Sequence, residues 1–214
     1  MIIIGAKGFA KEVLQVLEED DLSTIVFYDD ISSDLPEKLY GKFPILKSTE
    51  EALNYFKTID DRFTLGIGNP ILRKKMYDKF KALGGKFIST ISINVTMGSF
   101  GVEIGEGSNI LSGSIFSNSV IIGKGCIVYY NSILTHDSII GDFVEISPSV
   151  TVLGRVMIGS YSQLGANSTI LPNINIGKNV IVGAGSVVTK DLPDNCVAVG
   201  IPAKIIKELP ILEF

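Results

Sequence analysis

From Ile104 onward, apolar residues recur at every sixth position without interruption. The series holds fifteen residues: Ile104, Ile110, Phe116, Ile122, Val128, Leu134, Ile140, Ile146, Val152, Ile158, Leu164, Ile170, Ile176, Val182 and Val188. In a chain that is 46% apolar, such a run arises by chance with odds on the order of 10⁻⁵. A period of six fits neither a helix nor a simple strand. It predicts a parallel β-helix built from hexapeptides.

The residues between these positions carry a second pattern. Four positions after each comes a mostly small or branched residue, such as Ser108, Cys126 or Val144, and the pair Ile-Gly recurs at every third hexapeptide from Ile104. We therefore expect three hexapeptides per coil and five coils, stacked at the strand spacing of about 4.8 Å. The first residue of each hexapeptide should point into the prism, and the small fifth residue should fit its corner.

Short apolar runs and amphipathic segments alternate in the first part of the chain. Strands are expected at 2–4, 24–28 and 63–67, and helices at 11–19, at 49–56 and from Pro70. This alternation predicts a small parallel sheet. Glycines after the first strand would let a phosphate approach backbone N–H groups at a helix start. The spacing is not G-x-G-x-x-G, which argues against a dinucleotide, and a tight turn without a ligand remains an alternative.

The distribution of charge supports a division into two architectures. Residues 1–103 carry 28 charged side chains, whereas residues 104–193 carry nine. We expect a Rossmann-like α/β domain over residues 1–90, followed by an all-β parallel β-helix with a C-terminal tail over residues 91–214.

Composition excludes several classes of protein. The net charge of −4 argues against nucleic acid as a partner, which would need a basic face. No window approaches the roughly 20 apolar residues of a membrane span, and the N-terminus lacks the pattern of a signal peptide. The two cysteines, Cys126 and Cys196, have no paired spacing. We expect two reduced thiols in a cytoplasmic protein, with no metal site.

Candidate chemistry centres on the only histidine of the chain, His136, at the third position of its hexapeptide. Third and fourth positions form the turn between two faces, so the imidazole should project outward. Acyl transfer to an amine or a hydroxyl needs a base, and an imidazole suits this task at neutral pH. Asp137 follows and could orient the ring. The alternative is a histidine on a surface turn.

A glycine lies on the same expected corner, one coil further along. Gly154 follows His136 by three hexapeptides, and its missing side chain leaves the backbone N–H accessible to a thioester oxygen. Pro172, a further three hexapeptides on, has no N–H to offer. The alternative is a glycine required only by a strained turn.

Two further motifs support a family resemblance. The run 183–191 and the tail Gly200-Ile201-Pro202-Ala203-Lys204 resemble the closing part of the hexapeptide-repeat acyltransferases, whose β-helix is left-handed. Together with the N-terminal pattern, the whole chain resembles the bacterial sugar acyltransferases that modify nucleotide-linked amino sugars for cell-surface polysaccharide biosynthesis. Their relatives described as sialic acid O-acetyltransferases are similar as well. The left hand is an implication of this resemblance, because parallel crossovers are otherwise right-handed.

The resemblance implies a role for particular residues. His136 would be the general base, Asp137 its partner and Gly154 the oxyanion donor. Acetyl-CoA would lie against Gly154, Ala166, Ala184 and Lys204, and no metal is needed. The N-terminal domain would hold the nucleotide sugar, and the active sites would lie between neighbouring prisms of a homotrimer. The sugar-binding residues implied are Lys7, Gly8, Phe9, Asp29, Asp30, Gly68 and Asn69.

Two positions depart from the family pattern. Glu145 stands where some members have a second histidine, and Tyr129 stands where many have asparagine. They leave the acceptor sugar open. We expect transfer of an acetyl group from acetyl-CoA to an amino group of a nucleotide-linked sugar.

Three other functions would account for parts of this pattern. One is O-acetylation of a sugar such as sialic acid, and another is a non-catalytic nucleotide-sugar-binding protein. A γ-class carbonic anhydrase is disfavoured, because its zinc site needs three histidines and the chain has one.

Overall fold

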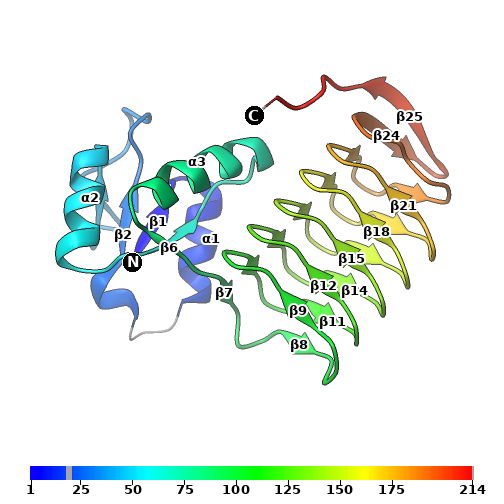
Figure 1. Ribbon diagram of the computed structural model, residues 1–214, viewed down its shortest axis with the longest axis horizontal. Helices are drawn as coiled ribbons and strands as arrows, with labels where there is room; N and C mark the ends of the chain where they lie inside the picture. The colour runs from blue at the N-terminus through cyan, green and yellow to red at the C-terminus, as the bar shows by residue number, and fades with distance from the viewer. Residues whose placement is uncertain (18–20, 214) are drawn as a thin grey trace. The chain divides into compact units, whose positions relative to one another are not determined.

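The computed structural model describes residues 1–17 and 21–213. The chain divides into two compact units, Met1–Thr90 and Ile91–Phe214 (Figure 1). The first is an α/β domain and the second a left-handed β-helix, as the sequence pattern and the family resemblance predict.

A six-stranded sheet forms the centre of the first unit, in the order β3-β4-β2-β1-β5-β6. All neighbouring strands are parallel except β3 and β4, which form an antiparallel pair that the sequence pattern did not predict. Both are short, and Pro44 interrupts the apolar run of β4. The strands are β1 (Ile2–Ile4), β2 (Val26–Tyr28), β3 (Lys38–Leu39), β4 (Phe43–Leu46), β5 (Arg62–Leu65) and β6 (Lys86–Phe87).

Within residues 1–17 and 21–90, three α-helices and a 3₁₀ turn connect these strands. They are α1 (Gly8–Val16), η1 (Asp21–Thr24), α2 (Thr49–Thr58) and α3 (Pro70–Ala82). Helix α1 begins three residues earlier than expected, because Phe9 and Ala10 are buried and continue its apolar face. The helix ends at Val16, earlier than expected, because Leu17 is extended and forms its C-cap; residues 18 and 19 of the expected helix lie outside the described residues. Pro70 occupies the first turn of α3, as predicted.

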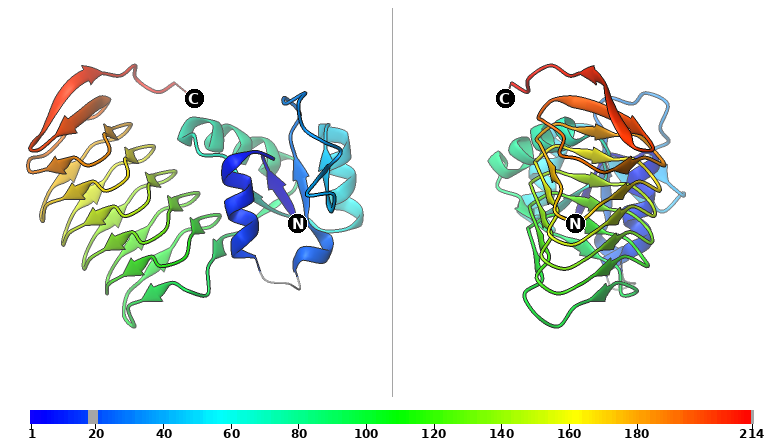
Figure 2. Two further views of the ribbon diagram at one scale, coloured as in Figure 1. Left: turned by 180° about the vertical axis from the view of Figure 1, so that it is seen from behind. Right: turned by 90° about the vertical axis from the view of Figure 1, so that its right-hand side faces the viewer.

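The second unit is a prism with three faces (Figure 2). Face 1 contains β7, β10, β13, β16, β19, β22, β24 and β25; face 2 contains β8, β11, β14, β17, β20 and β23; face 3 contains β9, β12, β15, β18 and β21. Paired residues are one coil apart, as Ile115 and Ile133 are. The first three strands are β7 (Thr90–Ile91), β8 (Thr96–Met97) and β9 (Glu103–Ile104).

The remaining strands of the prism are mostly two residues long. They are β10 (Asn109–Ile110), β11 (Ile115–Phe116), β12 (Ile121–Ile122), β13 (Ile127–Val128), β14 (Ile133–Leu134), β15 (Ile139–Ile140), β16 (Glu145–Ile146), β17 (Thr151–Val152), β18 (Met157–Ile158), β19 (Gln163–Leu164), β20 (Thr169–Ile170), β21 (Asn175–Ile176), β22 (Ile181–Val182), β23 (Val187–Val188), β24 (Cys196–Gly200) and β25 (Ala203–Glu208).

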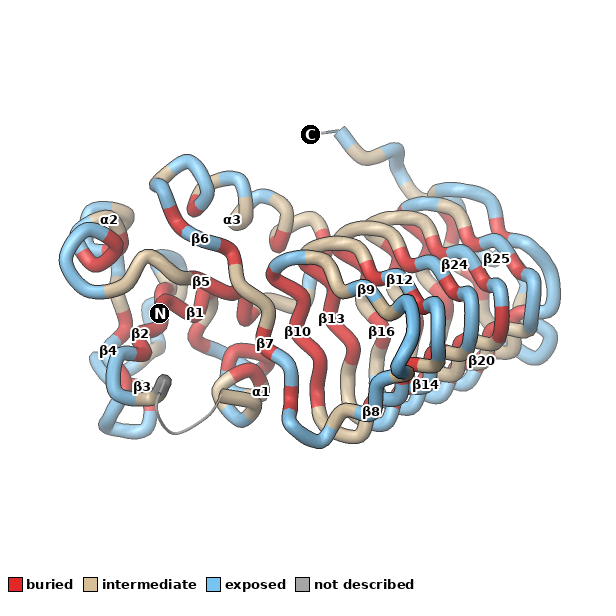
Figure 3. The backbone as a smooth tube through the Cα atoms, turned by 60° about the horizontal axis from the view of Figure 1, so that its bottom comes forward, coloured by how far each residue is buried: buried red, intermediate tan, exposed pale blue. Residues whose placement is uncertain are grey.

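Burial in the prism follows the hexapeptide pattern (Figure 3). Of the fifteen apolar first positions, every one from Ile110 to Val188 is buried, and Ile104 is half-buried. The fifth positions, such as Ser108, Cys126 and Val144, are buried as well. The predicted orientation of both positions is confirmed.

Strands β7, β8 and β9 form the first coil, and the six-residue series begins only in its last strand, at Ile104 of β9. Thr96 and Glu103 begin β8 and β9 and lie seven positions apart rather than six. This extra residue breaks the period, so counting back from Ile104 does not find β8. At the other end, β25 pairs with β24 in the antiparallel direction and ends the stack.

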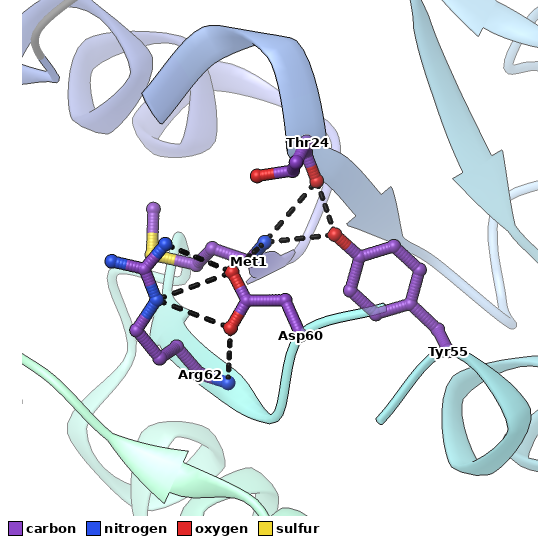
Figure 4. Close-up of polar contacts among 5 residues, drawn as sticks. All are labelled: Met1, Thr24, Tyr55, Asp60 and Arg62. Atoms are coloured by element: carbon purple, nitrogen blue, oxygen red, sulfur yellow. Dashed lines mark hydrogen bonds and ion pairs between the residues drawn. The ribbon is translucent and has the colours of Figure 1, made fainter. Parts of the chain in front are cut away.

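In the first unit, a polar cluster joins β1, α2 and β5 (Figure 4). The Met1 ammonium donates to the Tyr55 hydroxyl and to Asp60 Oδ2, each at 2.8 Å, and Arg62 Nη2 approaches the same carboxylate at 2.9 Å. Burial alone would raise the pKa of Asp60, but hydrogen bonds from Arg62 and from the ammonium hold it far below its usual range. Burial and the Asp60 charge raise the pKa of Tyr55 to about 12.

Replacing Asp60 by asparagine is expected to lower the free energy of unfolding at pH 7 by about 2–4 kcal/mol, because it leaves a buried ammonium without its counter-charge. The pKa of Asp60 is lowered in the folded state. Its stabilising contribution is therefore present above the unfolded pKa near 4 and is lost as the pH falls below it.

Urea unfolding of both proteins at pH 7 and at pH 2.5 measures this effect. The difference between them should narrow at the lower pH, and an equal difference at both pH values would contradict the role of the charge. Asp61→Asn is the matched control. Its exposed ion pair with Lys86 should be worth at most about 1 kcal/mol.

Candidate active site

His136 and Asp137 form the turn between β14 on face 2 and β15 on face 3. Asp137 has a φ of 61°, the left-handed conformation found at the same position of other hexapeptides. His136 Nδ1 and Asp137 Oδ2 are 2.8 Å apart, and each side chain is about half exposed, at 51% and 53%. This pairing leaves the other ring nitrogen, Nε2, available for a ligand.

Gly154 lies one coil further along the same corner, directly against the His136 ring. The Arg155 N–H donates to the carbonyl oxygen of His136 at 3.0 Å, which joins the two turns. A Cβ atom on Gly154 would lie 2.6 Å from both Cε1 and Nε2 of His136. The ring therefore occupies space that only glycine leaves open. His136, Asp137 and Gly154 lie together at one corner, as the sequence predicts from their spacing.

The other residues expected to bind acetyl-CoA lie elsewhere on the prism. Ala166 and Ala184 occupy the corner between faces 1 and 2, on successive coils, where the Gly185 N–H donates to the Ala166 carbonyl at 2.8 Å. Lys204 is exposed on β25. None of these three residues is at the His136 corner, which lies between faces 2 and 3. The two departures from the family pattern lie on face 1. Tyr129 directly follows β13, and Glu145 is the first residue of β16.

In the first unit, a cavity of about 380 Å³ opens at the carboxyl ends of three parallel strands. Residues after β1, β2 and β5 line it, together with Leu72 and Met76 of α3. Ligands of parallel sheets bind at this edge, where the chain crosses to the other side of the first strand. The loops needed to surround a ligand therefore come together here.

Six of the seven expected sugar-binding residues line this cavity: Lys7, Gly8, Phe9, Asp29, Asp30 and Gly68. Asn69 does not line it. Its side chain caps α3 by accepting a hydrogen bond from the Leu72 N–H at 2.9 Å. Leu72 and Met76 were not among the expected residues, although their spacing of four residues on one helix is a signal for a shared face.

Hydrogen bonds from neighbouring residues fix the two acidic side chains that line the cavity. Asp29 Oδ1 accepts hydrogen bonds from the backbone N–H groups of Ile31 and Ser32, at 3.2 and 2.8 Å. Asp30 Oδ2 accepts from the Tyr28 hydroxyl at 2.6 Å and from Lys79 Nζ at 3.0 Å. Burial opposes ionisation of Asp30, but these two hydrogen bonds lower its pKa. The Asp30 carboxylate is thus ionised and fixed in place at the cavity wall.

The helix that begins at the cavity differs from its neighbours at its first turn. Helix α1 starts at Gly8 without a hydrogen bond from a capping side chain, whereas Ser48 caps α2 and Asn69 caps α3. Uncapped N–H groups at a helix start attract anions. Lys7 precedes the helix, and its Nζ is 3.0 Å from Asp34 Oδ1 on the surface.

The described residues hold neither a metal-binding cluster nor a membrane-spanning helix. No group of three or more histidine, cysteine, aspartate or glutamate side chains in this part of the chain could hold a metal ion. None of the helices in the same residues is both long and apolar enough to span a bilayer.

Comparisons with known proteins agree with both units. Residues 1–80 match the family model of the PglD N-terminal domain, and residues 155–190 match that of the bacterial transferase hexapeptide (six repeats). A search of curated proteins gave no significant match.

Several solved structures are similar over nearly the whole chain. The acetyltransferase domain of PglB from Neisseria gonorrhoeae FA1090 is 28% identical, with a TM-score of 0.83 and coverage of 96% of this chain and 98% of that one. PerB from Caulobacter crescentus, in complex with CoA and GDP-perosamine, is 27% identical with a TM-score of 0.84 and covers 96% of each chain.

WeeI from Acinetobacter baumannii AYE is 29% identical, with a TM-score of 0.82 and coverage of 96% of this chain and 100% of that one. Two family models and these structures thus agree with the hexapeptide fold and with its α/β partner domain. The chain is an acetyltransferase, and it resembles the bacterial hexapeptide-repeat N-acetyltransferases of nucleotide-linked amino sugars.

Proposed function

We propose that the protein transfers the acetyl group of acetyl-CoA to the amino group of a nucleotide-linked sugar, with His136 as the general base. One observation carries this proposal: the His136 ring is held by Asp137 through Nδ1 and lies against Gly154. This arrangement combines a base with a backbone donor at one exposed corner. The complex of PerB with CoA and GDP-perosamine supports both the donor and the acceptor class.

In the proposed reaction, the sugar amine attacks the thioester carbonyl carbon while His136 Nε2 takes a proton from the amine. A C–N bond forms, and the carbonyl oxygen becomes an oxyanion that the Gly154 N–H stabilises. The C–S bond then breaks, and the imidazolium returns the proton to the CoA sulfur. Asp137 holds Nδ1–H in place, so that Nε2 carries the free lone pair at the start.

We assign the nucleotide sugar to the cavity of the domain over residues 1–90. Its volume of about 380 Å³ is within the range of small-molecule sites, and helix α1 begins there at Gly8 without a side-chain cap from Lys7. Such a helix start suits a diphosphate. Tyr28 and Lys79 hold the Asp30 carboxylate in place, where it can accept a hydrogen bond from a sugar hydroxyl.

We assign acetyl-CoA to the β-helix over residues 91–214. Gly154 would meet the thioester, while Ala166, Ala184 and Lys204 are proposed to contact the rest of the cofactor. Small side chains at 166 and 184 leave room along the neighbouring corner. Both cysteines are buried thiols, which fits a cytoplasmic location, where acetyl-CoA is available.

We propose a homotrimer in which the active site lies between two prisms. Apolar side chains stay exposed on both faces that meet at His136: Ile115 and Ile133 on face 2, and Ile121, Ile139 and Met157 on face 3. Contiguous exposed apolar residues indicate a covered surface, and a convex corner needs a second wall to enclose a ligand. Light scattering at assay concentration should give three times the chain mass of 23.1 kDa. A fully active monomer would contradict this assembly.

Thiol release from acetyl-CoA, measured with a panel of acceptors, tests the function. We expect turnover with nucleotide-linked amino sugars and none with the matched sugars that carry a hydroxyl in place of the amine. Turnover with sialic acid alone would favour O-acetylation. Tight binding of nucleotide sugars without thiol release from any acceptor would favour a binding protein.

A further inference from the structure

Backbone N–H groups at the third position of several hexapeptides share one kind of partner. The N–H donates a hydrogen bond to an Asn, Asp or Ser side chain at the same corner of the following coil. Asn118 Oδ1 accepts from Phe100 at 3.1 Å, Asp142 Oδ1 from Lys124 at 3.0 Å, and Ser160 Oγ from Asp142 at 3.0 Å. In each case the capping residue lies one coil beyond the residue that it caps.

At the corner that contains His136, this pattern stops after Asn118. The residue in the capping position over Gly154 is Pro172, which lies one coil further on and has no side-chain acceptor. The carbonyl of Gly154 accepts from the Asn173 N–H at 3.0 Å. Among the residues that the structure describes, none accepts a hydrogen bond from the Gly154 N–H. Gly154 is nevertheless buried beneath the imidazole.

A buried N–H without an acceptor is costly, and most are paired in folded proteins. Here the unpaired donor lies beside the one imidazole of the chain, where the proposed reaction develops negative charge. A polar residue at position 172 would satisfy this donor in the resting protein. The donor would then be unavailable to a ligand.

We infer that Pro172 is a positioning residue that keeps the Gly154 N–H unpaired for the thioester oxygen. It touches neither the acetyl group nor the amine in the proposed reaction. Pro172 offers no side-chain acceptor to the Gly154 N–H, whereas Asn118, at the same corner, accepts a hydrogen bond from the Phe100 N–H. The inference rests on the proposed function for its catalytic consequence, but the state of the Gly154 N–H can be measured without any substrate.

Pro172→Asn tests the inference, because it copies the residue type that caps Phe100. We expect kcat to fall about 10²-fold, the effect of losing one oxyanion donor, with little change in the KM for acetyl-CoA. Pro172→Ala removes the same ring without adding an acceptor, so its kcat should be far higher than that of Pro172→Asn. Lys178→Asn places an asparagine at the third position of another corner in the same coil and should also be silent.

Hydrogen exchange of the Gly154 amide provides the second measurement. It should be more than about tenfold slower in Pro172→Asn than in Pro172→Ala, because a hydrogen-bonded amide is protected. Equal exchange in the two variants, or equal kcat, would overturn the inference. If the wild-type chain transfers no acetyl group, the proposed function fails, and the exchange measurement still decides whether residue 172 controls this donor.

Discussion

Replacing His136 by alanine should lower kcat by about 10²–10⁴-fold, the usual contribution of one general base. The side chain is about half exposed and packs into no core, so the free energy of unfolding should change little. Steady-state thiol release and a thermal melt measure the two quantities. A variant that keeps more than about a tenth of the wild-type kcat would show that another group accepts the proton.

Asp137→Asn is the matched control for this experiment. Asparagine tolerates the left-handed backbone of residue 137, whose φ is 61°, so the turn should persist. The variant removes the charge that faces Nδ1 and not the base itself. Its loss of kcat should therefore be smaller than that of His136→Ala, and a larger loss would assign the main catalytic role to the carboxylate.

Replacing Gly154 by valine should lower kcat by about 10²-fold or more, because an atom displaced by about 1 Å from a reacting group can cost that much. The new Cβ would lie 2.6 Å from Cε1 and Nε2 of His136, so the ring must move. The branched side chain would also cover the Gly154 N–H. Kinetics with acetyl-CoA, and a crystal structure of the variant, measure both effects.

Lys178→Val is the corresponding control. It introduces the same side chain at the third position of a different corner, in an exposed residue. Its kinetics should equal those of the wild-type chain. Wild-type kinetics in Gly154→Val as well would refute the proposed place of the thioester.

The prism could be predicted from the sequence because its pattern is local and repeated. Each hexapeptide needs one apolar residue that points into the prism, and the series from Ile104 to Val188 supplies one in each of fifteen hexapeptides. The same period brings His136 and Gly154 to one corner, three hexapeptides apart, so the core of the site follows from counting. The first two strands of the first coil, β7 and β8, could not be found in this way, because the seven-residue step from Thr96 to Glu103 breaks the period.

The details of the first domain were harder to predict. Strands β3 and β4 are too short to show alternation, and their pairing depends on contacts with the rest of the sheet. The role of Asn69 depends on a single hydrogen bond to Leu72, which a glycine-asparagine pair after a strand does not reveal. The direction of the His136 ring, toward Gly154, is a matter of side-chain geometry that no sequence period specifies.

The regular stacking of the prism also bears on how quickly it can fold. Its paired residues, such as Ile115 and Ile133, are separated by a single coil, so the contacts within the prism are local in sequence. Domains with mostly local contacts fold faster than β-sandwiches, whose contacts join distant parts of the chain. Each new coil closes a loop of the same modest length onto the one before. We therefore expect β-structure in this protein to propagate from any completed coil along the chain.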